Sequence, residues 1–264
     1  MTTPAAAPDL SVVIPVFDEE EIVEQACREL MAQLDARGWD YELVLSENGS
    51  RDRTVAILER LARERPRLRF LSSPEPNYGL ALKRGILAAR GRLVVADEID
   101  LCDVSFHDRA LPILHAGRAD MVVGSKRARG SEDLRPAYRR LATWVHNSLL
   151  RVALGFQGTD THGVKAFWRA AIAPVAERCV VDRDVFASEL VLRAGLEGKR
   201  VLEIPIALRE KRPPSVGLVR RVPNVLRQVA RLFWVLRFRS PARHGGRGVA
   251  RPGDPERSGG QGGP

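Results

Sequence analysis

The chain has 264 residues, of which 44% are hydrophobic and 28% charged, a composition typical of globular domains that bury their own core. The net charge of +9 is uneven, because residues 209–264 carry +10 and the preceding residues −1. The longest stretch without a charged residue, 141–150, has ten residues, which is too short for the roughly 18 apolar residues of a membrane-spanning helix. The start of the sequence lacks the regions of a signal peptide, and three scattered cysteines predict neither a disulfide framework nor a zinc cluster. We therefore expect a reduced, cytoplasmic protein.

Composition divides the chain into four expected parts. They are a flexible leader (1–8), a main domain (9–212), a basic amphipathic segment (213–239) and a tail (240–264). The tail holds 8 Gly and 4 Pro with almost no apolar residues, so we expect it to be disordered.

In the main domain, apolar runs alternate with amphipathic segments. The runs predicted as buried strands are 10–16, 41–46, 68–72, 92–97 and 119–124. The segments predicted as helices are 19–36, 51–65, 78–90, 105–116 and 136–154. Buried strands separated by helices predict an α/β fold with a mostly parallel sheet covered on both faces.

Some details of these helices are also predicted. Asp18 is expected to cap the first helix, and Ser50 or Asp52 lies near the start of the second. His107 is expected on the surface of helix 105–116, without a role. Helix 136–154 carries an apolar stripe that we expect, together with Trp144, to lie in the core: Leu141, Val145, Leu149 and Val152.

Carboxylates gather where the predicted strands end, at the edge where parallel sheets bind ligands. The densest group follows the fourth strand: Asp97, Glu98, Asp100 and Asp103. Clustered carboxylates repel one another unless a positive charge lies among them, and Mg²⁺ is commonly held by one or two carboxylates plus substrate phosphates. The sequence has no phosphate-binding glycine loop at a strand end, so we expect a diphosphate substrate held by a metal and by basic side chains.

Seven segments in order resemble family 2 glycosyltransferases of the GT-A fold, and most closely the dolichyl-phosphate mannose and glucose synthases. The segments are SVVIPVFDEEE (11–21), ENGSRDRT (47–54), NYGLALKRG (77–85), EID (98–100), GSK (124–126), TDTHGVKAF (159–167) and LEIPI (202–206). The resemblance implies an inverting, metal-dependent transfer of a sugar from a donor of the GDP-mannose or UDP-glucose type to a polyprenyl phosphate.

The resemblance also implies a role for particular positions. Residues expected to bind the nucleotide sugar are Pro15, Phe17, Glu19, Glu47, Asp97, Glu98, Lys211 and Arg212. Glu98 and Asp100 are expected to hold Mg²⁺ or Mn²⁺, with Asp97 as an alternative ligand because the register of DEID is ambiguous. Cys102 stands where the synthases have a glutamine, and we expect it to be structural because a thiol suits Mg²⁺ poorly.

A phosphate acceptor is already an anion, so it needs positive charge rather than a general base. The resemblance points to Lys126, Arg139 and Thr143 as its binding site. Asp100, Lys126 and Arg139 are thus the expected catalytic residues.

Residues 219–239 interleave apolar and arginine positions, which is typical of a helix lying on an anionic membrane. The alternative is a helix packed on the body with a solvated arginine face. A peripheral location on the inner face of the membrane fits a lipid acceptor, and no nucleic-acid recognition motif accompanies the charge.

Two other functions remain open. A soluble family 2 enzyme with a hydroxyl acceptor needs a base, for which the candidates are Asp160, Asp182, Asp184 and Glu189. A non-catalytic sugar-nucleotide-binding protein is the other, since Asn48, Glu98 and Cys102 depart from the family pattern.

Overall fold

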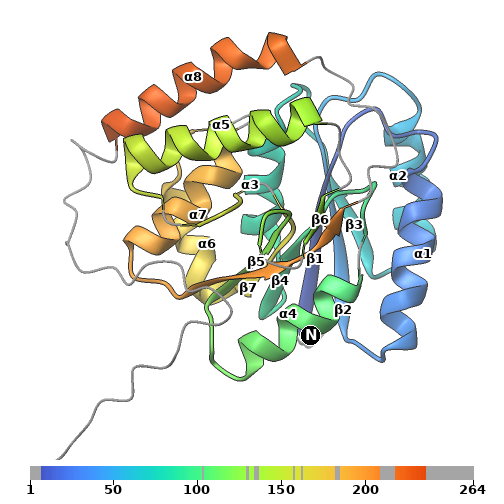
Figure 1. The fold of residues 1–264 in the computed structure, drawn as a ribbon. Helices are drawn as coiled ribbons and strands as arrows, with labels where there is room; N and C mark the ends of the chain where they lie inside the picture. The colour runs from blue at the N-terminus through green and yellow to red at the C-terminus, as the bar shows by residue number, and fades with distance from the viewer. Residues whose placement is uncertain are drawn as a thin grey trace, which may run out of the picture.

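The computed structural model describes a three-layer α/β molecule (Figure 1). The described backbone covers residues 7–102, 104–128, 131–133, 137–156, 158–161, 163–181, 185–208 and 218–235. Side chains are described in these ranges except at 132–133, 137–139, 141–143, 146, 153, 207–208, 218–223 and 225. The predicted tail and most of the predicted leader lie outside these ranges.

A seven-stranded sheet forms the middle layer. In spatial order its strands are β3 (Leu68–Leu71), β2 (Tyr41–Glu47), β1 (Leu10–Val16), β4 (Leu93–Ala96), β7 (Lys165–Trp168), β5 (Met121–Ser125) and β8 (Val201–Pro205). Every neighbouring pair is parallel except the two made by β7, which runs antiparallel to β4 and to β5. The mostly parallel sheet is confirmed. A small parallel pair joins β6 (Glu132–Asp133) to β9 (Ala207–Leu208).

Helices cover both faces of the sheet. One face carries α1 (Val23–Ala36), α2 (Thr54–Glu64) and α4 (Val104–His115). The other carries α3 (Tyr78–Ala88), α6 (Arg169–Arg178) and α7 (Phe186–Leu196). Figure 1 shows α5 (Ala137–Leu154) and α8 (Leu218–Trp234) lying along the top of this second layer. No helix in the described part of the chain is long and apolar enough to cross a membrane.

The strands divide their side chains between two cores. In β1, Val12 and Ile14 pack toward α1 and α2, whereas Val13 packs toward α3, and all three are fully buried. This two-residue alternation of apolar side chains on both faces is why the strands read as continuous apolar runs.

The predicted cap of the first helix is wrong. Helix α1 begins at Val23, and Asp18 instead has a left-handed backbone with φ 51°. Its carboxylate accepts a hydrogen bond from the N–H of Arg51 at 2.7 Å, so Asp18 joins two loops rather than capping a helix. Asp52 does lie at the start of α2, where it accepts from the N–H of Thr54 at 2.9 Å.

The expected core stripe of α5 is also wrong in part. Val145 is 52% exposed, Val152 89% and Trp144 52%, whereas Leu150 and Asn147 on the opposite side are buried. The sequence pattern shows that the helix has an apolar side, but it does not show whether another element covers that side.

Candidate active site

The loops after β1 and β2 are locked together at the carboxyl edge of the sheet. The N–H of Asp18 donates to the hydroxyl of Ser50 at 3.0 Å, and that of Glu19 donates to Thr54 at 2.9 Å. Phe17 and Glu19 lie half-buried on this connection, and Pro15 lies in β1 beside Ser46 of β2. The predicted nucleotide-binding residues at the end of β1 and just after it therefore lie where hydrogen bonds join the two loops.

Glu47 is buried, and each of its two carboxylate oxygens accepts a hydrogen bond from another residue of the chain. One accepts from the N–H of Ser50 at 2.5 Å, and the other accepts from the hydroxyl of Ser72 at 2.6 Å. Each carboxylate oxygen can accept a second hydrogen bond, so Glu47 can make these bonds and also contact the nucleobase of a donor.

Asn48, one of the positions that depart from the pattern of the resembled family, joins three segments through its amide group. Its amide nitrogen donates to the carbonyl of Val16 at 2.8 Å, and its oxygen accepts from the N–H of Asn77 at 2.9 Å. A carboxylate lacks the donor that the first of these bonds needs. The amide therefore ties β1 and the start of α3 to the end of β2.

Asp97 points into the core, and the prediction that His107 is a surface residue is wrong. Both side chains are fully buried, with Nε2 of His107 3.2 Å from Oδ2 of Asp97. The other oxygen of Asp97 accepts from the N–H of Glu98 at 2.8 Å. The pair therefore fixes the start of the turn that carries Glu98 and Asp100. The ring of Trp39 stacks on His107 and covers it.

Glu98 and Asp100 lie half-buried on the loop after β4. Burial raises the pKa of Glu98, and the nearby Asp100 raises it further, whereas Lys126 and Lys165 act in the opposite direction. Tyr78, at the start of α3, belongs to the same group. Desolvation of its hydroxyl, followed by the nearby carboxylates, raises the pKa of Tyr78 above its usual value.

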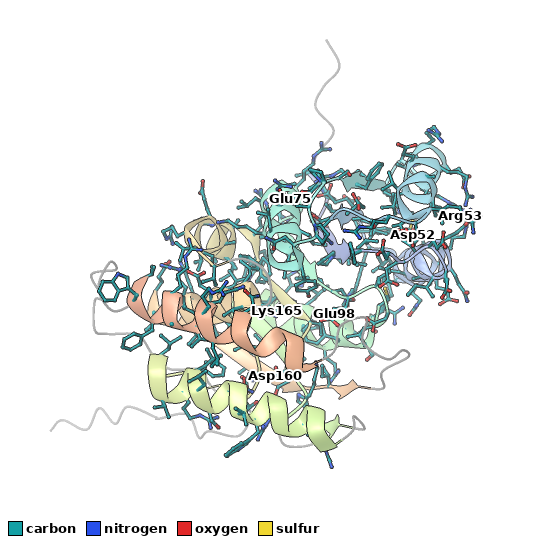
Figure 2. The ribbon with its side chains drawn as sticks, turned by 90° about the horizontal axis from the view of Figure 1, so that it is seen from above. Asp52, Arg53, Glu75, Glu98, Asp160 and Lys165 are labelled. Carbon is teal, nitrogen blue, oxygen red and sulfur yellow. The ribbon has the colours of Figure 1, made fainter. Side chains whose placement is uncertain are left out.

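Lys165 brings a buried cation to these carboxylates. It begins β7, is 2% exposed, and donates to the carbonyl of Gly163 at 2.6 Å. Burial lowers the pKa of Lys165 to about 8, although Asp160 and Glu98 favour its charged form. Figure 2 shows Glu98, Asp160 and Lys165 near one another in the same part of the molecule.

Glu203 organises the turn that holds Asp160. Its Oε1 accepts from the N–H of Thr159 at 2.7 Å and from the N–H of Asp160 at 3.2 Å, and its Oε2 accepts from the hydroxyl of Thr159. On α5, the amide of Asn147 donates to the carbonyl of Thr159 at 2.6 Å. Asp160 in turn accepts from the N–H of Lys126 at 3.3 Å, so this network positions the residue that follows β5.

Gly124 and Gly163, two glycines of the quoted motifs, pack closely against each other. A Cβ added at Gly163 would lie 1.7 Å from the carbonyl oxygen of Gly124. A Cβ on Gly124 would lie 2.8 Å from Val164 and 2.9 Å from Ile206. Gly163 therefore requires glycine because its backbone touches that of Gly124, whereas Gly124 requires it because the side chains of Val164 and Ile206 fill the space.

Several predicted residues cannot be placed. Those outside the described residues or side chains are Asp103, Arg139, Thr143, Asp182, Asp184, Lys211 and Arg212. Among the alternative bases, Glu189 is buried, and its oxygens accept from the N–H groups of Val180 and Val181 and from Arg193. Asp160 is thus the one alternative base that the described chain leaves at the site.

The described carboxylates fit a metal that also binds substrate oxygens. No three potential metal-ligating side chains come together among the residues that the structure describes. Glu98 and Asp100 supply two carboxylates next to each other, and their mutual repulsion is relieved by a cation. Mg²⁺ sites in which substrate phosphates complete the ligand set are commonly built in this way. Cys102 directs its thiol to the carbonyls of Glu98 and Ile99 within its own turn, consistent with a structural role.

The structure adds three residues to the site that the sequence did not single out: Tyr78, Lys165 and Glu203. All three lie inside the quoted motifs, so their positions were visible in the sequence. Their roles were not, because each role depends on contacts between distant segments.

Comparison with known families identifies the domain. The profile of the family described as Glycosyl transferase family 2 matches residues 11–173. Glycosyltransferase AglD of Haloferax volcanii is 30% identical over 240 residues, which are 89% of this chain and 38% of that protein. An undecaprenyl-phosphate 4-deoxy-4-formamido-L-arabinose transferase of Edwardsiella ictaluri is 28% identical over 81% of this chain and 64% of its own. The chain thus spans between about two fifths and two thirds of the length of these two relatives.

Solved structures show the same fold at low sequence identity. A mannosyltransferase, PcManGT from Pyrobaculum calidifontis, in complex with GDP-Man and Mn²⁺, matches with a TM-score of 0.59 and 19% identity, over 90% of this chain and 66% of that one. Glucosyl-3-phosphoglycerate synthase from Mycobacterium tuberculosis, in complex with Mn²⁺, UDP and phosphoglyceric acid, matches with a TM-score of 0.59 and 20% identity, over 86% and 78% of the two chains.

Proposed function

Because this chain belongs to glycosyl transferase family 2, we propose that it transfers a sugar from a nucleoside diphosphate sugar to a polyprenyl phosphate. The observation that carries the proposal is the meeting of Glu98 and Asp100 with Lys126 and Lys165 at the carboxyl edge of the sheet. Relatives named as undecaprenyl-phosphate and dolichyl-phosphate transferases support the acceptor class.

The proposed reaction exchanges one bond at the anomeric carbon. An oxygen of the acceptor phosphate forms a bond to that carbon from the face opposite the leaving group. The bond to the donor diphosphate breaks, so the configuration inverts and the nucleoside diphosphate leaves. Bound at Glu98 and Asp100, Mg²⁺ or Mn²⁺ supplies positive charge for the leaving diphosphate.

Side chains of this chain prepare both substrates. We propose that Lys126, whose backbone N–H donates to Asp160, binds the acceptor phosphate together with Arg139 and Thr143. The acceptor needs no base because it is already an anion. We propose that Pro15, Phe17, Glu19 and Glu47 hold the nucleoside, and that Lys211 and Arg212 close over the diphosphate of a donor of the GDP-mannose or UDP-glucose type.

Nucleotide binding is the first test. The thermal stability of the protein is measured with UDP and with GDP, each with and without Mg²⁺ or Mn²⁺. A nucleotide at 100 times its Kd that binds only the folded protein adds about 2.7 kcal/mol to the unfolding free energy. We expect this shift with one nucleotide and only with metal. A folded protein that shows no shift with either nucleotide contradicts the proposed function.

Turnover is the second test. The protein is incubated with donor and a short-chain polyprenyl phosphate, and the glycolipid is detected by mass spectrometry. Asp100→Asn should lower turnover at least about 100-fold, a loss of about 2.7 kcal/mol in transition-state stabilisation. The matched control is Asp108→Asn, which removes a carboxylate that pairs with Arg37 on the surface of α4 and should leave turnover unchanged. Equal activity of the two variants contradicts the proposed metal site.

Acceptor binding is tested separately. Arg139→Ala should weaken use of the acceptor while nucleotide binding persists. Loss of both acceptor use and nucleotide binding contradicts the proposal that separate residues bind the two substrates. Transfer to a hydroxyl acceptor that disappears in Asp160→Asn, with no transfer to a lipid phosphate, would favour the soluble enzyme.

A further inference from the structure

The outward side of α5 is apolar and uncovered. Trp144, Val145 and Val152 lie within about 100° of one another around the helix axis, and they are 52%, 52% and 89% exposed. The opposite side of the helix is anchored by Leu150, which is fully buried in the core above the sheet. The helix is therefore held on the body with an apolar strip facing outward.

Helix α8 has the same arrangement. Val229 and Leu232 are buried in the same core as Leu150, whereas Leu226 is 52% exposed, Phe233 38% and Trp234 59%. The described apolar side chains of this helix thus divide between two sides: one side packs on the body and the other remains exposed. The packing of this helix on the body agrees with the second alternative drawn from the sequence, and its membrane binding stays a prediction.

The two helices lie side by side in both views (Figures 1 and 2) and contact each other directly. Because the two helices are neighbours and each buries its inner side in this core, we infer that their outer sides adjoin. We call this surface the α5–α8 face and define it by Trp144, Val145, Val152, Leu226, Phe233 and Trp234. These six are the majority of the ten exposed large apolar side chains in the described chain. Such clustering marks an interaction surface rather than scattered surface residues.

The charges on these helices identify the partner. Neither α5 nor α8 contains an aspartate or glutamate, whereas together they contain seven arginines. The arginines with described, exposed side chains are Arg140, Arg151, Arg227 and Arg231. Tryptophan and aliphatic side chains bordered by arginines match the boundary between the acyl chains and headgroups of an anionic bilayer.

The same helix that exposes this face also supports the candidate site. On α5, Asn147 donates to the carbonyl of Thr159, and Arg151 donates to that of Gly158 at 3.2 Å. Gly158 and Thr159 directly precede Asp160, whose carboxylate accepts a hydrogen bond from the N–H of Lys126. A bilayer against α5 would therefore lie against the element that holds the turn of the acceptor site.

We propose that the α5–α8 face docks the protein on the surface of an anionic bilayer and so presents a membrane-embedded acceptor phosphate to the candidate site. The docking is inferred from the exposed face alone, whereas the presentation of the acceptor rests on the proposed function. Both helices lie flat on the lipid, with the apolar side chains inserted and the arginines at the headgroups.

Vesicle binding by the full chain tests the docking. Cosedimentation is measured with phosphatidylcholine vesicles and with vesicles containing 30% phosphatidylglycerol. Val152→Glu places a charge at the most exposed apolar position, and Leu87→Glu makes the same charge change at an exposed residue of α3. We expect binding to phosphatidylglycerol vesicles that weakens with salt, falls at least tenfold in Val152→Glu and is unchanged in Leu87→Glu. Equal binding by the two variants, equal binding to both lipids, or no binding by the native chain overturns the proposal.

Two further measurements separate docking from self-association and from a general loss of activity. A dimer that Val152→Glu converts to a monomer, in a chain that does not bind vesicles, assigns the face to self-association and overturns the proposal. Turnover is then compared with a short-chain acceptor in solution and a long-chain acceptor in vesicles. We expect Val152→Glu to lose turnover only in vesicles, and loss in both overturns its docking role. Absence of turnover in the native chain with either acceptor refutes the proposed function, whereas vesicle binding still decides the docking.

Discussion

Replacing Gly163 with alanine tests the close packing beneath the site. The new methyl group would lie 1.7 Å from the carbonyl oxygen of Gly124, whereas real Cβ contacts are essentially never shorter than 3.0 Å. The two backbones must therefore separate by at least about 1.3 Å. That separation disrupts the hydrogen bond from the N–H of Gly124 to the carbonyl of Val164, which is 2.8 Å long.

The expected loss combines two effects. Forcing a methyl group into a filled space typically costs about 1–3 kcal/mol. A weakened backbone hydrogen bond adds about 0.5–1.5 kcal/mol. We expect the free energy of unfolding to fall by about 2–4 kcal/mol in urea titrations, which lowers Tm by about 3 °C per kcal/mol for a chain of this size.

The matched control is Gly195→Ala in α7. A Cβ there meets no atom within 4 Å, and the residue lies inside a helix. Because glycine is a poor helix former, this substitution should raise stability by up to about 1 kcal/mol. A Gly163→Ala protein within about 0.5 kcal/mol of the native one, or two alanine variants with the same sign, would refute the packing argument.

Three further predictions follow from the ionisable groups. Hydrogen-bonded ion pairs with Arg60 and Arg28 lower the pKa of Glu24 to about 2, so they stabilise the folded chain above pH 4.5 and progressively less as pH falls toward 2. In urea titrations Glu24→Gln should therefore have a lower free energy of unfolding than the native chain at pH 7. If the difference in unfolding free energy between the two proteins grows on acidification, the predicted sign is wrong. Burial raises the pKa of Cys27 to about 12, so iodoacetamide at pH 8 should label the half-buried Cys102 in the native protein and Cys27 only after denaturation, as peptide mass spectrometry will show. His107→Phe leaves a buried carboxylate without its partner and should cost about 2–4 kcal/mol, whereas His107→Gln, which keeps a donor, should cost less; equal losses contradict the hydrogen bond's importance.

The sequence predicts the sheet well because its buried strands are short apolar runs between helices. It predicts neither β7, which has four residues and begins with Lys165, nor the direction in which this strand runs. The direction of a strand depends on the connection that brings the chain back to the sheet, and the side-chain pattern of the strand does not show that connection.

Burial of single residues is less predictable than secondary structure. His107 is expected on the surface because its helix is expected there, but a buried partner, Asp97, offers it a hydrogen bond. Val152 was expected in the core because it belongs to an apolar stripe, yet it is 89% exposed. In both cases the outcome depends on a neighbour from another element, which the local sequence does not contain.

The position of β7 between β4 and β5 has a consequence for how the chain folds. Strands β1 to β4 can pair with one another once residue 96 has been synthesised, but β5 pairs only with β7 and β8 in the sheet. Until residues 165–168 are available, β4 and β5 each present an unpaired edge, which is a site for aggregation. The candidate site takes Glu98 from the loop after β4 and Lys126 from the loop after β5. The two sides of the site are therefore joined late, by a strand that arrives from the opposite direction.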